Sequence, residues 1–274
     1  MSSSPYLSVI IPAYRQAGTI AADLQRLNDL IKTLVPSYEL VLVIDGNEDN
    51  TLNNVRRSLS LPNLTIECFD HNQGKGAALR HGLQRSHGEV VAFIDAGNDI
   101  DPSFLQIMLA EFKLHHADIV IGSKRHSLSE VDYPWLRRVY STTYQILNRL
   151  LFCLKVRDTQ VGLKICRREV LTAVLPRIVV KKFAFDLELL VVANHLGYQR
   201  IVEAPVKIKY NFSSTIRLID IWRTFIDTLA IFYRLRFLHW YDRPLPAASA
   251  PVLVSGIDVS IHHEATRVRE KIHR

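Results

Sequence analysis

Short apolar runs alternate with longer amphipathic stretches over the first 123 residues of the chain. Each run has the length and the β-branched content of a buried strand. Between the runs, apolar residues recur at helical spacing, as at Ile20, Leu24 and Leu27. Strands alternating with helices predict a parallel, right-handed, doubly wound α/β sheet. The predicted strands are 7–11, 39–44, 64–69, 90–94 and 118–122, and the predicted helices are 18–34, 51–59, 75–86 and 102–115.

After residue 123 the pattern changes to long helices with few strands. Helices are predicted at 135–154, 167–175, 186–197 and 216–240, and strand-like segments at 161–166 and 201–210. We therefore expect one domain over residues 1–215, with a nucleotide-binding half at about 5–123 and a second half at about 124–215. The helix 216–240 is basic and aromatic. The segment 241–274 is predicted to be a loosely ordered tail.

The composition is that of a globular protein with an excess of positive charge. Of 274 residues 48% are hydrophobic, the net charge is +7 and the pI is near 9.4. Such a charge suits nucleotide phosphates, an acidic membrane surface or nucleic acid, but no nucleic-acid-binding motif accompanies it. Three widely spaced cysteines argue against a disulfide framework or a zinc site. With no signal peptide and no membrane-spanning apolar run, we expect a cytoplasmic protein that is soluble or peripheral on the membrane.

The stretch 89–102 is the first candidate for chemistry. A buried strand there is followed at once by three carboxylates, Asp95, Asp99 and Asp101. The carboxyl end of a parallel strand is where open α/β sheets bind ligands, and carboxylates this close repel one another unless a cation lies among them. The alternative is a turn with solvated acids, in which Asp101 caps a helix beginning at Pro102.

Two other loops carry candidate binding groups. Asp45 follows the second strand, and Lys75 stands among glycines at the start of a helix. A cation and a flexible backbone at a helix start favour binding of a phosphate. The alternatives are a turn-forming Asp-Gly pair at Asp45 and a simple glycine turn at Lys75.

Seven short segments, taken in order, resemble the inverting glycosyltransferases of family 2, which have the GT-A fold. Within that family the chain is most similar to the dolichyl-phosphate and polyprenyl-phosphate glucose and mannose synthases. The resemblance covers residues 7–215. The segments are 8–14, 43–51, 72–77, 95–99, 122–125, 157–164 and 183–188.

The resemblance implies a nucleotide-sugar donor held by the first loops. Pro12 and Tyr14 would lie along the nucleobase, Asp45 would bind the base or ribose, and Lys75 would lie near the diphosphate. Arg15 and Gln16 stand where the family often has Asn-Glu.

The resemblance also implies a divalent metal, Mg²⁺ or Mn²⁺. Gly97 stands where the family's Asp-x-Asp motif has its second Asp, and Asp95 keeps the first position. We expect Asp95 and Asp99 to bind the metal together with the donor diphosphate.

For the acceptor phosphate, the resemblance implies Lys124, Arg137 and Ser141. The last two are four residues apart and share one face of a helix. The alternative is a solvated basic face.

Asp186 corresponds to the general base of relatives with alcohol acceptors. Since a phosphate acceptor is already ionised, Asp186 is expected to orient the sugar or the acceptor, with a helix N-cap as the alternative.

Together these features predict an inverting hexosyltransferase with Asp95, Asp186, Lys124 and Arg137 as catalytic residues. The expected donor is UDP-glucose first and GDP-mannose second, and the expected acceptor is a polyprenyl or dolichyl phosphate. One alternative is the same fold acting on a soluble or non-phosphate acceptor with Asp186 as base. Another is a non-catalytic nucleotide-sugar-binding protein. The helix 216–240 either lies in a membrane interface, packs on the domain or pairs in a homodimer.

Overall fold

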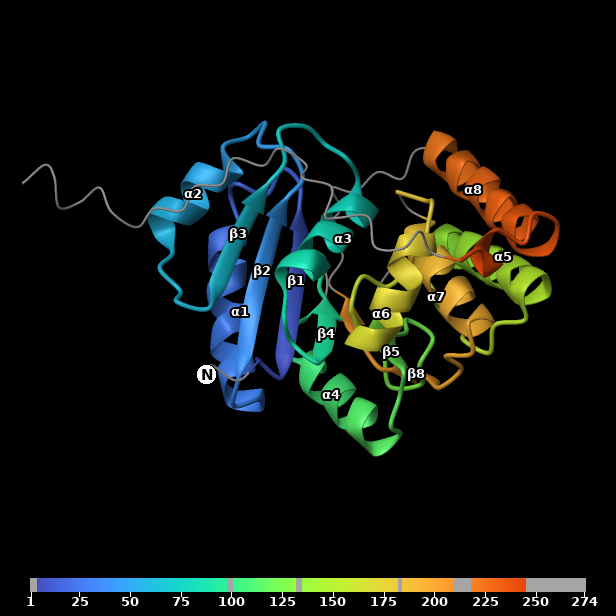
Figure 1. Ribbon diagram of the computed structural model, residues 1–274, viewed down its shortest axis with the longest axis horizontal. Helices are drawn as coiled ribbons and strands as arrows, with labels where there is room; N and C mark the ends of the chain where they lie inside the picture. The colour runs from blue at the N-terminus through green and yellow to red at the C-terminus, as the bar shows by residue number, and fades with distance from the viewer. Residues whose placement is uncertain (1–3, 98–100, 132–134, 182–183, 209–217, 245–274) are drawn as a thin grey trace, which may run out of the picture.

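A seven-stranded sheet is the centre of the computed structural model, which describes residues 4–97, 101–131, 135–181, 184–208 and 218–244 (Figure 1). The strand order is β3-β2-β1-β4-β7-β5-β8, and every pairing is parallel except those of β7 with β4 and β5. The predicted doubly wound, mostly parallel α/β sheet is confirmed. The strands are β1 (Leu7–Ala13), β2 (Tyr38–Ile44), β3 (Leu64–Cys68), β4 (Val90–Phe93), β5 (Ile119–Gly122), β7 (Lys164–Arg167) and β8 (Ile201–Ala204).

Helices cover both faces of the sheet, which is why its strands are apolar on both sides. Successive residues of β2 alternate between two cores, with Val41 and Val43 in one and Leu40 and Leu42 in the other. Helices α3 (Lys75–Arg85), α6 (Arg168–Val174) and α7 (Phe185–His195) contribute to the first core. Helices α1 (Ile20–Leu34), α2 (Thr51–Ser58) and α4 (Phe104–Leu114) contribute to the second.

Two of the boundaries that differ from the predicted ones lie near prolines. Pro12 was expected to end the first strand, but β1 continues through it to Ala13. Pro12 is tolerated because the pairing of β1 with β4 stops at Ile10, so the missing N–H faces no partner strand. Helix α4 begins two residues later than predicted, and Asp101 accepts the backbone N–H of Ser103 at 3.0 Å just before it.

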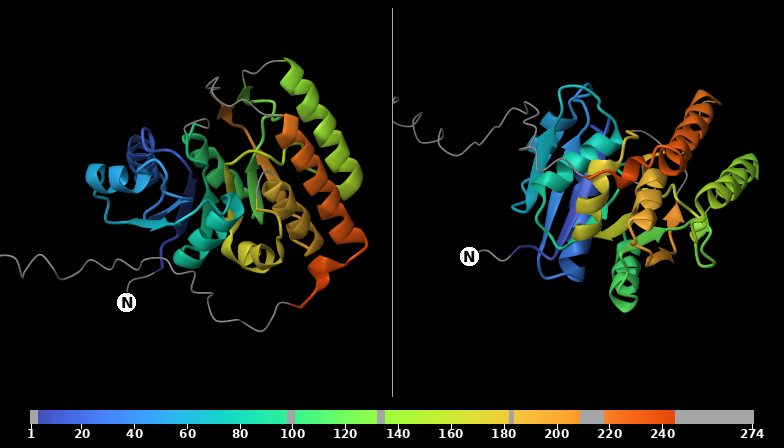
Figure 2. Two further views of the ribbon diagram at one scale, coloured as in Figure 1. Left: turned by 90° about the horizontal axis from the view of Figure 1, so that it is seen from above. Right: turned by 45° about the vertical axis from the view of Figure 1, so that its right-hand side comes forward.

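The second half of the chain adds two long helices, α5 (Trp135–Phe152) and α8 (Leu218–Arg236), at the end of the molecule away from α2 (Figures 1 and 2). These helices pack against each other. A two-stranded sheet, β6 (Glu130–Val131) with β9 (Lys207–Ile208), lies outside the main sheet. No helix within the described residues is long and apolar enough to cross a membrane.

A buried carboxylate attaches the C-terminal helix to the domain. Glu188 of α7 is fully buried and accepts hydrogen bonds from the Tyr241 hydroxyl at 2.6 Å and Arg234 at 3.2 Å. Its other oxygen accepts the backbone N–H groups of Val179 and Val180. Tyr241 was predicted to belong to the loosely ordered tail, yet it is fully buried. The rest of that predicted tail, from residue 245, lies outside the described residues.

Candidate active site

Five of the predicted site residues meet at the carboxyl edge of the parallel strands. Tyr14 follows β1, Asp45 follows β2 and Asp95 comes two residues after β4. Lys75 is the first residue of α3, and Asp186 is the second residue of α7. This is the edge at which doubly wound sheets bind their ligands.

A chain of alternating charges lies at the centre of this edge. The Lys75 Nζ is 2.8 Å from Asp95 Oδ1 and 3.0 Å from Asp186 Oδ2. The Lys164 Nζ is 2.7 Å from Asp186 Oδ1 and also donates to the carbonyl of Val161. Sequence reasoning missed Lys164, which is almost completely buried in β7.

The charges stabilise one another against the cost of burial. Burial raises the pKa of Asp186, but Lys164 and then Lys75 lower it by more, so its pKa is below its ordinary value. Burial lowers the pKa of Lys75, and Asp186 and Asp95 more than offset this, so its pKa is raised. A carboxylate paired with two lysines in this way is a weak proton acceptor. The alternative of a helix N-cap at Asp186 is wrong, because its carboxylate contacts the lysines and the N-cap residue of α7 is Ala184.

Asp95 is held from the other side by the backbone of Gly162. A Cβ at position 162 would lie 1.8 Å from Asp95 Oδ2, which is far inside van der Waals contact. Any larger residue there would therefore displace the Asp95 carboxylate. The glycine was visible in the 157–164 segment, but its partner could not be read from the sequence.

Asp45 holds the loop that carries Lys75. Its two oxygens accept the backbone N–H groups of Gln73 at 2.6 Å and Gly74 at 2.9 Å, and it is only 4% exposed. Gly74 has a φ of +94°, and a Cβ there would lie 2.6 Å from the Lys181 carbonyl oxygen. The observed contacts of Asp45 are thus with this loop, and its contact with a base or ribose stays a prediction.

Tyr14 offers a partly exposed aromatic ring at the end of β1. The ring is 38% exposed, its hydroxyl donates to Glu48 Oε2 at 3.2 Å, and the Arg15 guanidinium lies 5.2 Å from the ring centroid. Pro12 precedes it within β1 and is half-buried. The Arg15–Glu48 pair was missed, although Arg15 stands directly after Tyr14.

Two of the three predicted phosphate-binding residues line one pocket. Lys124, after β5, and Ser141, on α5, both face it. The Lys124 Nζ is 3.7 Å from Asp158 Oδ2, and its backbone N–H donates to the same oxygen at 3.0 Å. Arg137 lies on α5 one turn before Ser141, but its side chain is outside the described residues. Arg125 was missed; its guanidinium donates to the Ser141 hydroxyl at 3.3 Å.

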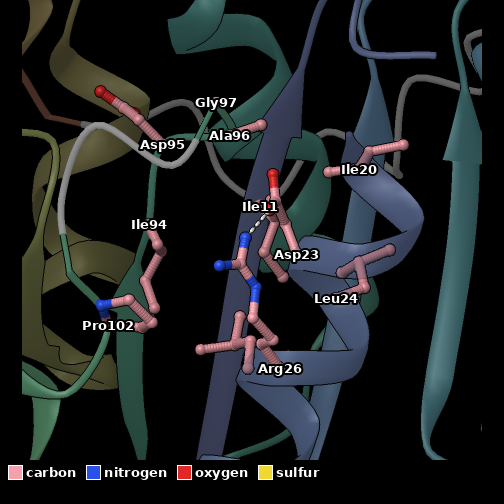
Figure 3. A pocket seen from close by; sticks show the side chains of 11 residues that line it. Ile11, Ile20, Asp23, Leu24, Arg26, Ile94, Asp95, Ala96, Gly97 and Pro102 are labelled. Carbon is pink, nitrogen blue, oxygen red and sulfur yellow. Dashed lines mark hydrogen bonds and ion pairs between the residues drawn. The ribbon is translucent and has the colours of Figure 1, made fainter. Parts of the chain in front are cut away.

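Only part of the predicted metal site can be described. Asp99 lies outside the described residues, and among those described no three His, Cys, Asp or Glu side chains gather as a metal site. The Asp95 side chain is 41% exposed. Figure 3 shows it pointing away from the pocket beneath its loop, which is lined by Ile11, Asp23 and Arg26 among others. Both Asp95 oxygens contact the Lys75 ammonium, Oδ1 at 2.8 Å and Oδ2 at 3.0 Å. The partly exposed carboxylate is compatible with a cation that takes one protein carboxylate and completes its shell with phosphate and water oxygens.

Comparison with known proteins identifies a matching family and several similar proteins. Residues 8–175 match the family Glycosyl transferase family 2. A dolichyl-phosphate beta-glucosyltransferase of Dictyostelium discoideum is 27% identical over 70% of this chain and 63% of its own length. A dolichyl-phosphate beta-glucosyltransferase of Trichomonas vaginalis is 29% identical over 85% of this chain and 75% of its own length. The chain thus spans less than two thirds of the Dictyostelium relative.

A solved structure with the same architecture is glucosyl-3-phosphoglycerate synthase from Mycobacterium tuberculosis in complex with Mn²⁺, UDP and phosphoglyceric acid. It superposes with a TM-score of 0.63 and 20% identity, over 88% of this chain and 80% of that one. This likeness shows the predicted GT-A fold.

Replacing Lys164 should test the chain of charges. In Lys164→Met, the buried Asp186 keeps Lys75 as its one lysine partner, and we expect the free energy of unfolding at neutral pH to fall by about 1–3 kcal/mol, the effect of losing one partner of a buried group. A carboxylate with a lowered folded-state pKa stabilises the fold above its unfolded pKa, about 3.9, and loses this as pH falls through the folded pKa. Because Lys164 lowers that pKa most among the partner charges, acid unfolding of the variant should begin at higher pH.

Urea unfolding measured across the acid range would detect both effects. Lys32→Met, which removes an exposed lysine from α1, is the matched control and should change stability by less than about 0.5 kcal/mol. Equal stability and equal acid unfolding of the two variants would contradict the proposed role of Lys164.

Proposed function

Because this chain belongs to glycosyl transferase family 2, we propose that it transfers a hexose from a nucleotide sugar to a polyprenyl phosphate, with inversion at the anomeric carbon. The relatives named as dolichyl-phosphate beta-glucosyltransferases support this reaction class. The observation that carries the proposal is that one loop contacts both the predicted acceptor-phosphate site and the predicted donor site. The loop from Asp158 to Gly162 touches Lys124 at one end and Asp95 at the other.

The donor side of the site is formed by the first loops of the sheet. Tyr14 and Pro12 lie along the nucleobase, and Asp45 binds the base or ribose. Lys75 lies near the diphosphate, where its positive charge is retained because its pKa is raised. UDP-glucose is the first donor and GDP-mannose the second.

Asp95, with Asp99, would hold Mg²⁺ or Mn²⁺. The partly exposed carboxylate of Asp95 fits that role, since such metals need only one or two protein carboxylates beside substrate phosphates. When bound, the metal supplies positive charge to the departing nucleoside diphosphate.

The acceptor side needs no general base. A phosphate monoester is already ionised near neutral pH, so its oxygen attacks the anomeric carbon directly while the bond to the nucleoside diphosphate breaks. The bonding electrons leave with the diphosphate, and an α-linked donor gives a β-linked product. Lys124, Arg137 and Ser141 hold the acceptor phosphate. Asp186 is a positioning residue, because it fixes Lys75 and Lys164.

The reaction can be tested with labelled donors and a short polyprenyl phosphate in detergent with Mn²⁺, followed by organic extraction. We expect label from UDP-glucose, or else from GDP-mannose, in the organic phase. Lys124→Gln should lower kcat/KM for the acceptor by about 10- to 100-fold, the effect of losing a charge-assisted hydrogen bond. Lys32→Gln, at an exposed site on α1, should leave it unchanged.

Other outcomes would identify a different function. Label that stays in the aqueous phase on a soluble acceptor, with activity lost in Asp186→Asn, would favour a transferase that uses Asp186 as base. Stabilisation by a nucleotide sugar without turnover on any acceptor would favour a non-catalytic binding protein.

We further propose that α5 and α8 bind a membrane surface, where a polyprenyl phosphate would be found. The two packed helices expose apolar side chains at helical spacing beside exposed arginines such as Arg149 and Arg236. That combination is typical of helices lying in the interface of an anionic bilayer. Glu188 and the Tyr144–Thr228 hydrogen bond of 2.9 Å fix α8 to the domain. The exposed apolar residues of the two helices are Ile146, Leu150, Trp222, Phe225, Ile226, Leu229 and Tyr233, and Phe237 follows directly after α8.

Vesicle sedimentation would test this surface. The variant Trp222→Ser with Ile226→Ser should bind vesicles containing anionic lipid at least about 10-fold more weakly, because two exposed apolar side chains no longer enter the interface. Leu114→Ser, at a 72% exposed position on α4, is the matched control. Equal vesicle binding of the double variant and the wild type, or a dimer that dissociates in the double variant, would contradict the proposal.

A further inference from the structure

The pocket that contains Lys124 and Ser141 extends to two side-chain amides. Asn148 of α5 and Gln160 of the following loop line it together with these two residues. Neither amide belongs to the set predicted to hold the acceptor phosphate. Both amides have buried atoms that make no hydrogen bond to the described residues, which makes them candidates for contact with a ligand.

Asn148 is a buried polar side chain whose amide makes no well-formed hydrogen bond to the described residues. It is 3% exposed, and both its Nδ2 and its Oδ1 lack such a bond. The Tyr144 hydroxyl, which bonds Thr228 Oγ1 at 2.9 Å, is close enough to interact with Asn148 as well. The Nε2 of Gln160 is likewise buried and unbonded among the described residues. Burying such a group unpaired costs about 1–3 kcal/mol, so its presence calls for a partner that binds there.

Gln160 is held rigidly in this position. Its backbone N–H donates to Asp158 Oδ1 at 3.0 Å, and the other oxygen of Asp158 accepts the N–H of Lys124. Glu203 of β8 accepts the N–H groups of Arg157 and Asp158 at 2.8 and 3.1 Å. Two residues after Gln160, Gly162 touches Asp95. The amide therefore lies on the segment that joins the phosphate pocket to the donor side.

The unpaired atoms limit the chemistry of the ligand. A phosphate oxygen accepts hydrogen bonds, so it can satisfy the N–H groups of Asn148 and Gln160 but not the Oδ1 of Asn148. A hydroxyl group both donates and accepts, and it can satisfy all three atoms. Lys124 in the same pocket adds a cation suited to a phosphate. The pocket thus fits a molecule in which hydroxyls lie next to a phosphate.

We propose that Asn148 and Gln160 bind hydroxyls of the hexose in the glycosyl phosphate head group, while Lys124 and Ser141 hold its phosphate. The assignment rests on the proposed transfer reaction, whose product joins a hexose directly to a phosphate. Asn148 and Gln160 then select the sugar that is transferred. A bound hexose gives the Asn148 Oδ1 a donor that a phosphate alone does not supply.

The test uses small phosphates that do not depend on turnover. β-Glucose 1-phosphate and β-mannose 1-phosphate represent the head group, and methyl phosphate represents the phosphate alone. We expect the whole 274-residue chain to bind at least one hexose phosphate about 3- to 10-fold more tightly than methyl phosphate, measured by NMR titration. Asn148→Leu and Gln160→Met should abolish this preference, and each should weaken methyl phosphate binding less than Lys124→Gln does. Lys124→Gln should weaken both kinds of ligand and keep the preference.

Several results would overturn the assignment. One is equal binding of methyl phosphate and both hexose phosphates by the wild type. Another is a preference that persists in both amide variants, as expected if a water fills the pocket. If Asn148→Leu is unfolded by circular dichroism, the half-buried loop variant Gln160→Met decides the question. Failure of every polyprenyl phosphate as acceptor would overturn the transfer reaction, while the binding comparison would still report on the pocket.

Discussion

Four buried or half-buried charges alternate in sign across the site, and the neighbouring loops hold these charges in place. Asp95, Lys75, Asp186 and Lys164 come from four different segments of the chain. Charges removed from water are costly unless each has an opposite charge close by, so removal of Lys75 or Asp186 leaves an end member of the chain without its opposite charge. The antiparallel pairing of β7 with β4 places Lys164 opposite Phe93, two residues from Asp95. This pairing inserts β7, which comes later in the chain, between β4 and β5.

The loops around these charges are fixed by contacts that tolerate little change. Asp45 holds the turn before Lys75, and Gly74 allows the Lys181 carbonyl to approach closely. Gly162 likewise allows the Asp95 carboxylate to approach the backbone closely. These contacts fix the positions of Lys75 and Asp95 relative to each other, and such positioning is a major source of rate enhancement in enzymes.

The sequence was sufficient to predict the alternation of strands and helices. It was also sufficient to predict the loops that carry Asp45, Lys75, Asp95 and Asp186. Apolar periodicity and motif order are local properties, and local patterns can be read directly. Lys164 and the amides of Asn148 and Gln160 were not identified, because their importance comes from burial and from partners far away in the chain. A lysine in a short strand looks like a surface residue until the register of that strand is known. The same holds for Pro12, which is compatible with β1 only because β4 has already ended there.

The role of the charged centre is tested most directly by Gly162→Ala, with Gly18→Ala as its matched control. A Cβ at position 162 would overlap the Asp95 carboxylate, whereas position 18 has no atom within 4 Å of an added Cβ. The rate of hexosyl transfer to polyprenyl phosphate should fall about 100-fold or more in Gly162→Ala. It should remain at the wild-type level in Gly18→Ala, with both proteins folded by thermal unfolding. Wild-type turnover in Gly162→Ala would contradict the placement of Asp95 at the reacting centre.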